Sequence, residues 1–381
     1  LLYPCLLMAA SASAQNTMTS SPYSMFGLGA MASGLYGQNT SMAGVTVGMR
    51  EGMLMNIENP AGLTALDSCK LFAEASAFVK NERYRSDGSS SSAFTGNFSA
   101  FSLGGRIMRR WYMSVGVTPY SFVGYYFKSS QELEGSPGTF VASTFSGTGG
   151  LSQGFLLTKH LSVGMNLNFI FGNMTLNEIQ SAMTVSREMS GRSFYADFGL
   201  QYHRPIARET FLTVGAIYGY KQRISLKNTV TVTGSNTETP YNQKRVTQYL
   251  PQYIGIGSSL AHKKWTYALD YLFRQYGVLN SSDSRVKFRD SHELRLGVCY
   301  FPNGFSSSSY WKRMSYKAGV SVSTPYLRLK GQSGGAYRVS VGLGLPVLNG
   351  RINTAFYYDR LQLQGNALRR DIMGFTVTYT L

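Results

Sequence analysis

The sequence lacks a long uninterrupted hydrophobic run, although 43% of its 381 residues are hydrophobic. No apolar stretch reaches the roughly 18 residues that a transmembrane helix requires, which argues against a helical membrane protein. Charged residues make up only 14% of the chain, while Tyr, Phe and Gly number 26, 22 and 41. That composition also argues against a disordered chain. The classes that remain are a soluble all-β protein and a membrane β-barrel.

Cysteine and linker sequence are scarce as well. The three cysteines are Cys5, Cys69 and Cys299, so there is no disulfide framework, although a single bridge between the last two stays open. No Pro-rich, Ser-rich or charged linker follows the first 68 residues, which predicts one large continuous unit. The net charge is +17, but the basic residues are scattered. We therefore expect attraction to the anionic phosphates of membrane lipids rather than binding to nucleic acid.

The first residues, LLYPCLLMAASASAQ, read as the remnant of an export signal. An apolar core is followed by the small-residue pattern Ala12-Ser13-Ala14, with Gln15 as the expected first mature residue. A lipoprotein signal at Cys5 is the rival interpretation, but Leu2-Tyr3-Pro4 is a poor approach to a lipidated cysteine. Residues 1–14 are accordingly assigned to a partial signal peptide.

Strict alternation of apolar and polar residues is the dominant pattern from about residue 70 to the end. In the last such run Met373, Phe375 and Val377 alternate with Gly374 and Thr376. Runs of this kind predict long strands with one apolar face and one face of small, polar residues. We count about fourteen, near 70–85, 93–108, 111–128, 139–158, 161–175, 190–203, 209–226, 248–262, 264–276, 291–301, 314–328, 336–347, 352–363 and 370–381.

The predicted connections alternate between short and long, which is typical of a transmembrane barrel with unlike rims. Tight turns are expected at Arg109-Arg110, Lys159-His160 and Leu348 to Arg351, where Asn-Gly favours a two-residue hairpin. Longer polar loops are expected at 129–138, 176–189, 228–247 and 277–290, with 302–313 as a long exception on the short side. Closure follows because an open sheet edge in hydrocarbon would leave backbone groups without hydrogen-bond partners. The sequence thus predicts an all-β, antiparallel transmembrane β-barrel of about 14 strands.

The segment before the barrel does not alternate and is rich in glycine, which permits close approach between backbones. Its stretch SMAGVTVGMREGMLMNIENPAGLT, residues 41–64, resembles the start of the FadL-like family of outer-membrane transporters for long-chain fatty acids and other hydrophobic compounds. In that family a Gly/Ala-rich stretch precedes an Asn-Pro-Ala motif, which Asn59, Pro60 and Ala61 match and Gly62 follows.

This resemblance implies an N-terminal hatch, residues 15–68, inside the lumen of a barrel formed by residues 69–381. It also implies localisation in the bacterial outer membrane and passive uptake of a hydrophobic small molecule, such as a long-chain fatty acid, that leaves toward the bilayer. Pro60 would fix a turn and Asn59 would satisfy nearby backbone groups in such a hatch. An ordinary Asn-Pro turn without any gating role is the alternative for this motif. The ligand-binding residues cannot be assigned from the sequence.

Enzyme signals are weak. Gly150-Leu151-Ser152-Gln153-Gly154 matches the G-x-S-x-G pattern, but it lies within an alternating strand rather than at a strand-to-helix turn. The four histidines fall near strand ends without metal-ligand spacing. Glu293 and Arg295 are expected to form an ion pair in the lumen, as are Asp270 and Arg274. No enzyme activity, metal site, cofactor or nucleic-acid partner is predicted.

Two functions remain in view. The first is a passive channel for hydrophobic compounds, with outer-membrane lipid and the small-molecule ligand as partners. The predicted interior, which is markedly polar and rich in glycine, is the weak point of this function. The second is an accessory or structural barrel of a protein secretion machinery, for instance a type 9 translocon partner, which the FadL-like resemblance also implies because some proteins of that family are such scaffolds.

Overall fold

The computed structural model describes residues 24, 28–32, 37–67, 71–86, 89–133, 136–180, 183–234, 238–279, 286–302, 309–329, 331–347, 350–364 and 368–381. The predicted signal segment 1–14, Cys69 and the turn residues Leu348-Asn349 lie outside these ranges. Among the described residues, no helix has both the length and the hydrophobicity needed to cross a membrane.

The chain folds into a closed antiparallel barrel of 14 strands, as the alternation predicts. Each strand pairs with the next along the chain, and the last pairs with the first through β19 and β2. Two wall strands are kinked, because β8 continues as β9 and β10 continues into β11. In chain order the wall consists of β2 Leu71–Ser86, β3 Ser89–Met108, β4 Trp111–Leu133, β5 Ser136–Leu156, β6 Leu161–Gln180, β7 Met183–Ala207, β8 Thr210–Gly219 with β9 Gln222–Thr233, β10 Glu238–Leu250 with β11 Tyr253–His262, β12 Trp265–Arg274, β14 Ser291–Tyr300, β15 Ser315–Ser323, β17 Gly334–Val347, β18 Gly350–Leu363 and β19 Arg369–Thr380.

Smaller elements lie inside the barrel or at its rims. The N-terminal part contributes the two-residue strand β1 Ala30–Met31 and the 3-10 helices η3 Gln38–Met42 and η4 Pro60–Ala65. The rim elements are η5 Tyr276–Val278, the small sheet of β13 Val286–Phe288 with β16 Leu327–Leu329, and the one-turn helix α2 Tyr310–Arg313.

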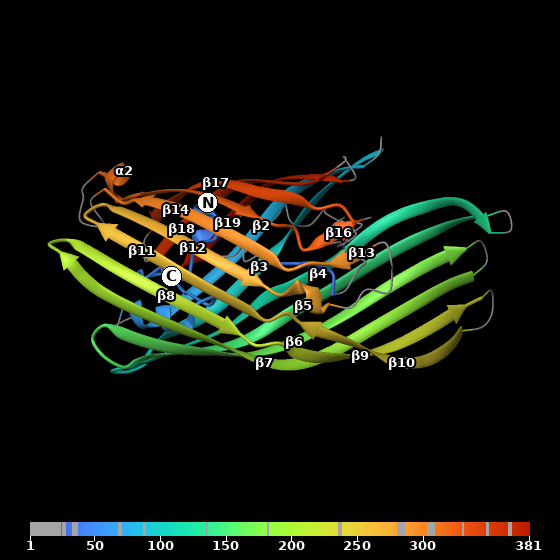
Figure 1. Cartoon of the computed structure of the whole chain (residues 1–381), viewed down its shortest axis with the longest axis horizontal. Helices are drawn as coiled ribbons and strands as arrows, with labels where there is room; N and C mark the ends of the chain where they lie inside the picture. The colour runs from blue at the N-terminus through green and yellow to red at the C-terminus, as the bar shows by residue number, and fades with distance from the viewer. Residues whose placement is uncertain are drawn as a thin grey trace.

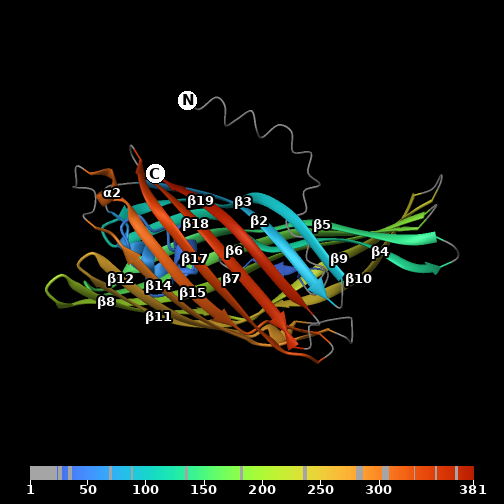
Figure 2. The same ribbon diagram turned by 90° about the horizontal axis from the view of Figure 1, so that it is seen from above.

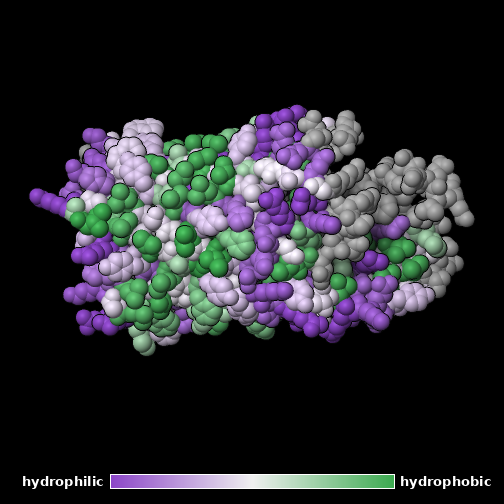
Figure 3. All heavy atoms as spheres, in the orientation of Figure 1, coloured by the Kyte–Doolittle hydropathy of each residue, from purple (hydrophilic) through white to green (hydrophobic). Residues whose placement is uncertain are grey.

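The outward side chains of the wall are apolar over one broad belt. On β19, Phe375 and Val377 are exposed by 41% and 38%, whereas the inward Thr376 is exposed by only 2%. Figure 3 shows hydrophobic side chains gathered nearer the short-turn rim, with hydrophilic ones at that rim and beyond the belt on the other side. Aromatic rings cross the strands near the short-turn rim, where Trp265 lies 4.5 Å from Tyr300 and is stacked on Tyr267.

Three of the predicted long loops are wrong. Residues 129–138, 176–189 and 228–247 lie mostly in strands, because the hairpins β4–β5, β6–β7 and β9–β10 extend well beyond the rest of the wall. Figure 1 shows these hairpins projecting at the right of the barrel. On β9 the alternation continues with the opposite polarity, since Ile224, Leu226 and Val230 are buried on the inside and polar residues face out.

Candidate functional site

The N-terminal segment of residues 37–67, called the inner segment below, lies within the barrel near the short-turn rim. Figures 1 and 2 both show it in blue inside the left half of the wall. Its apolar side chains are almost fully buried against inward residues of the strands, with Met42, Val45 and Leu63 at 0% exposure. The lumen at this level is therefore filled by the chain's own residues.

Close approach between the inner segment and the wall depends on inward glycines. A Cβ atom at Gly164 on β6 would lie 2.4 Å from the backbone of Pro60 and Ala61, and one at Gly215 on β8 would lie 2.1 Å from the carbonyl oxygen of Val47. No side chain fits at either distance. The alternation in the sequence predicts a face of small residues on these strands but does not indicate what that face accommodates.

The motif residues 59–62 lie at this contact. Asn59 is fully buried, and its amide group donates to the carbonyl oxygens of Val47 at 2.7 Å and Leu200 at 3.3 Å. Its side-chain oxygen accepts from the Ala61 N–H at 3.2 Å and caps η4, which begins at Pro60. Each of these bonds joins the motif to backbone, so one side chain ties the inner segment to itself and to β7.

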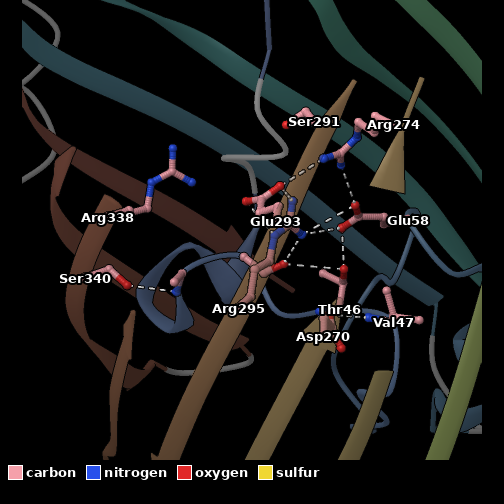
Figure 4. A network of polar contacts seen from close by, with 12 residues as sticks. Thr46, Val47, Glu58, Asp270, Arg274, Ser291, Glu293, Arg295, Arg338 and Ser340 are labelled. Carbon is pink, nitrogen blue, oxygen red and sulfur yellow. Dashed lines mark hydrogen bonds and ion pairs between the residues drawn. The ribbon is translucent and has the colours of Figure 1, made fainter. Parts of the chain in front are cut away.

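A buried ion-pair network joins the inner segment to the opposite wall (Figure 4). Glu58 lies 3.4 Å from Arg274 on β12 and 3.2 Å from Arg295 on β14, and both arginines bond Glu293 at 2.9 Å. The side chain of Arg295 is only 2% exposed and also donates to the Gly44 carbonyl oxygen at 2.6 Å. The predicted ion pair between Glu293 and Arg295 is therefore confirmed, and Glu58 and Arg274 extend it.

Asp270 has a different partner from the one predicted. It faces inward on β12, but its carboxylate accepts from the backbone N–H groups of Thr46 and Val47 at 2.7 and 2.9 Å rather than pairing with Arg274. The side-chain oxygen of Ser340 on β17 likewise accepts from the Ala43 N–H at 2.8 Å. Two strands thus satisfy backbone donors of the inner segment that would otherwise be buried without partners.

A second set of charges anchors the inner segment near the short-turn rim. Arg351 on β18 bonds Glu51 at 2.8 Å. Burial by itself would raise the pKa of Glu51, but Lys317 and Arg351 more than offset this and hold its pKa below the ordinary value. Burial lowers the pKa of Arg50 to about 10, and Arg50 donates to side-chain oxygens of the wall on β6 and β7.

Beyond the network the interior opens into two adjoining cavities of about 220 and 160 Å³. They share Met31, Arg274 and Tyr276 in their linings. The larger cavity is lined by aromatic rings such as Phe78 and by the ion pair of Arg338 and Asp359, in which Arg338 Nη2 donates to Asp359 Oδ2 at 2.8 Å. Next to them lies a buried apolar cluster of Leu28, Ile170, Ile224, Leu226, Leu250, Tyr276 and Leu279. This part of the interior can accept a small molecule with apolar and polar groups.

The wall is not paired over its full height. Strands β3 and β4 pair from Met108 with Trp111 to Phe101 with Val117, while β2–β3 and β4–β5 continue to the ends of their hairpins. Within the described strands, the free edge of β4 above this point is taken by β1, with Ala30 opposite Phe122.

The contact between β1 and β4 is reinforced on both sides. The Ala32 N–H donates to the Tyr120 carbonyl oxygen at 2.9 Å, and the Ser121 hydroxyl donates to the Leu28 carbonyl oxygen at 2.6 Å. Because Met31 and Ala32 also line both cavities, residues 28–32 separate the interior from the gap between β3 and β4. We call these residues the gap segment.

The other sequence candidates do not form a site. Gly150 to Gly154 lie inside the regular strand β5, without the strand-to-helix turn of a nucleophile elbow, and Ser152 is buried. Cys299 on β14 is half-buried and has no disulfide partner among the described residues, which do not include Cys69. Within the described ranges, no group of three His, Cys, Asp or Glu side chains is placed to hold a metal ion.

A family model described as BamG matches residues 1–373. The chain belongs to the BamG family. No curated protein matches this BamG-family chain. Several solved structures do, among them the Pseudomonas putida toluene transporter TodX, with 15% identity, a TM-score of 0.63 and coverage of 91% of this chain and 97% of that chain.

The Ralstonia pickettii toluene transporter TbuX gives 14% identity and a TM-score of 0.62, with coverage of 91% and 97%. A Pseudomonas aeruginosa FadL homologue gives 12% identity and a TM-score of 0.60, with coverage of 92% and 98%. At these identities the likeness concerns the fold. The resemblance of residues 41–64 to the FadL-like family therefore holds for the architecture. The family model that matches the chain is described as BamG and not as FadL.

The close contact between the inner segment and the inward glycines leads to a direct prediction. We expect Gly164→Ala to lower the free energy of unfolding by about 1–3 kcal/mol, because the new methyl group meets fixed backbone of Pro60 and Ala61. Gly149→Ala is the matched control on β5, since a Cβ there meets nothing within 4 Å. Urea unfolding of both variants in lipid vesicles, followed by tryptophan fluorescence, measures the difference. Equal effects would mean that the inner segment does not pack against β6 as described.

Proposed function

We propose that this protein is a barrel of the bacterial outer membrane that lets small hydrophobic molecules cross by passive diffusion. The observation that carries the proposal is the gap between β3 and β4, which only the gap segment separates, among the described residues, from the two cavities. The apolar outward belt supports placement in a bilayer. The names of the similar structures, which are channels and transporters for toluene and monoaromatic hydrocarbons, are consistent with this function.

The proposed path runs from the far rim into the cavities and then sideways. Transfer would be driven by burial of apolar surface, without energy coupling. Exit toward the short-turn rim is blocked by the inner segment, which the buried ion pairs hold in place. A molecule that leaves must therefore pass between β3 and β4, which requires the gap segment to separate from β4. Monoaromatic hydrocarbons and long-chain fatty acids are the two ligand classes to be tested.

A cross-link tests this requirement. Ala30 and Phe122 are directly opposed, and Cα atoms of opposed antiparallel residues lie about 4.5–5.5 Å apart, within the range of a disulfide. We expect Ala30→Cys with Phe122→Cys, in a Cys69→Ser and Cys299→Ser background, to reduce uptake of labelled toluene or oleate by intact cells at least about tenfold when oxidised. Reductant should restore uptake.

The matched control is Ala355→Cys with Thr376→Cys, opposed residues of β18 and β19 that belong neither to the gap segment nor to the two strands beside the gap. This cross-link should leave uptake unchanged. If the locked gap segment passed the ligand as fast as the reduced form, lateral release would be excluded.

The filled lumen favours a second candidate, an accessory barrel of an outer-membrane protein machinery. The inner segment bonds to many strands, and the charges around Arg295 are satisfied within the barrel, as a purely structural part would require. In a deletion strain, loss of secreted proteins with unchanged uptake of toluene and oleate would favour this candidate. The opposite pattern would favour the channel.

A further inference from the structure

The outward face of the extended strands changes from apolar to polar at one level. On β6 the last apolar outward residues are Phe169 and Phe171, and the next outward residue is Asn173. On β7 the last is Phe194, and the next outward residue is Arg192. Phe171 lies directly opposite Arg192, so the change occurs at the same height on both strands. We infer that the hydrocarbon layer of the membrane ends here and that the strands continue into the headgroup region.

An open groove of about 810 Å³ lies on this outward face just beyond the change. It is lined by three exposed cations from three strands, Arg192 on β7, Lys227 on β9 and Arg245 on β10. No ion-pair partner of these three is found among the residues that the structure describes. Glu188, the acid nearest along β7, is opposite Thr229 and is absent from the groove lining.

The register brings the three cations together. Ser190 is opposite Lys227, so Arg192 is one outward position away on the neighbouring strand, at a Cα distance of roughly 7–8 Å. Arg245 falls at the bulge of β10, next to Val246, which is opposite Leu226. Three positive charges from three strands thus line one groove, an arrangement that suits a phosphate group better than a single carboxylate.

The rest of the groove identifies the ligand class further. Its other polar lining consists of hydroxyl and amide side chains, Asn173, Thr175, Ser190 and Ser225, which suit sugar hydroxyl groups. Beneath the cations lie packed phenylalanines, with the Phe169 ring 4.7 Å from Phe194 and 6.1 Å from Phe171. Phe194 is 73% exposed. The site therefore offers a surface for acyl chains directly below the cations.

We propose that this groove binds a phosphorylated glycolipid of the outer leaflet, of the lipid A type. The acyl chains lie on the phenylalanines, the phosphate lies among Arg192, Lys227 and Arg245, and the sugar contacts the hydroxyl and amide groups. A soluble phosphate would leave the apolar half of the site unused. The proposal rests on the membrane placement proposed above but does not depend on transport.

The test is native mass spectrometry of the full chain in detergent, titrated with lipid A. Arg192→Gln with Lys227→Gln and Arg245→Gln should bind lipid A at least about tenfold more weakly than the unchanged protein. The control, Arg208→Gln with Lys263→Gln and Lys264→Gln, removes the same charge from exposed positions at the short-turn rim and should bind normally. Lipid A without its phosphates should also bind at least about tenfold more weakly to the unchanged protein.

Several results would overturn the proposal. These are equal weakening in the two triple variants, displacement of lipid A by an equal concentration of phosphatidylglycerol or of an acidic peptide, and no binding by the unchanged protein. Lys227→Gln alone, which should weaken binding severalfold, provides the test if the triple variant fails to fold. Loss of toluene and oleate uptake with unchanged lipid A binding would remove the channel function and leave this site standing.

Discussion

Arg295→Met is expected to lower the free energy of unfolding by about 3–5 kcal/mol, because it removes one partner from a buried charge network. The change leaves Glu58 and Glu293 to share Arg274 and frees the carbonyl oxygen of Gly44. Urea unfolding in lipid vesicles measures the effect. In the double variant with Glu293→Met, part of the loss should be recovered, since the surplus buried carboxylate is removed while Glu58 and Arg274 stay paired.

Arg360→Met is the matched control for this prediction. Arg360 also bonds a carboxylate, Asp371, at 2.8 Å, but its side chain is 29% exposed at the far rim. A solvent-exposed pair contributes only about 0–1 kcal/mol. Equal losses for Arg295→Met and Arg360→Met would contradict the account, because the network around the inner segment would then have no special role in stability.

Val377→Arg is expected to lower the free energy of unfolding by about 2–4 kcal/mol, because an arginine on the lipid-facing side near the midplane must lose its hydration. Val377 lies within the apolar belt and is 38% exposed. Thr229→Arg is the control, since Thr229 also lies on a strand, faces outward and lies above the belt near Lys227. There the cost should be about 0–1 kcal/mol. A similar cost at both positions would mean that the belt does not face hydrocarbon.

The number and phase of the strands could be predicted because lipid and lumen impose opposite demands on successive residues. Alternation such as Phe375, Thr376 and Val377 therefore survives along nearly every strand. The same rule failed where strands leave the belt. On β9 the outside is polar and the inside apolar, and the Thr-Val-Thr-Val run at 229–232 continues the strand beyond the belt, where the sequence analysis predicts a loop.

The candidate site was only partly predictable, because it joins residues remote in sequence. Glu293 and Arg295 are two residues apart on one strand, which puts them on one face and makes their pairing predictable. Glu58 and Arg274 belong to different parts of the chain, and only the closed barrel brings them together. The inward glycines were visible, but their function depends on the backbone of residues 47–61, whose path no periodicity indicates.

The gap segment and the groove lined by Arg192, Lys227 and Arg245 depend on sheet register, which the sequence does not specify. Nothing in the alternation of β3 and β4 marks the end of their pairing at Phe101 and Val117. The opposition of Ser190 and Lys227 likewise follows only from the paired strands β7 and β9.

The central claim is that every second side chain of the wall faces the acyl chains of the lipid, while the side chains between them face the inner segment. Fluorescence quenching by brominated lipid tests this claim most directly. Single cysteines labelled with a fluorophore at Phe375 and Val377 should be strongly quenched in vesicles of lipid brominated along the acyl chain. Labels at Thr376 and Thr378, which are buried on the inward side, should not be quenched. Quenching without a period of two, or none at Phe375 and Val377, would contradict the account.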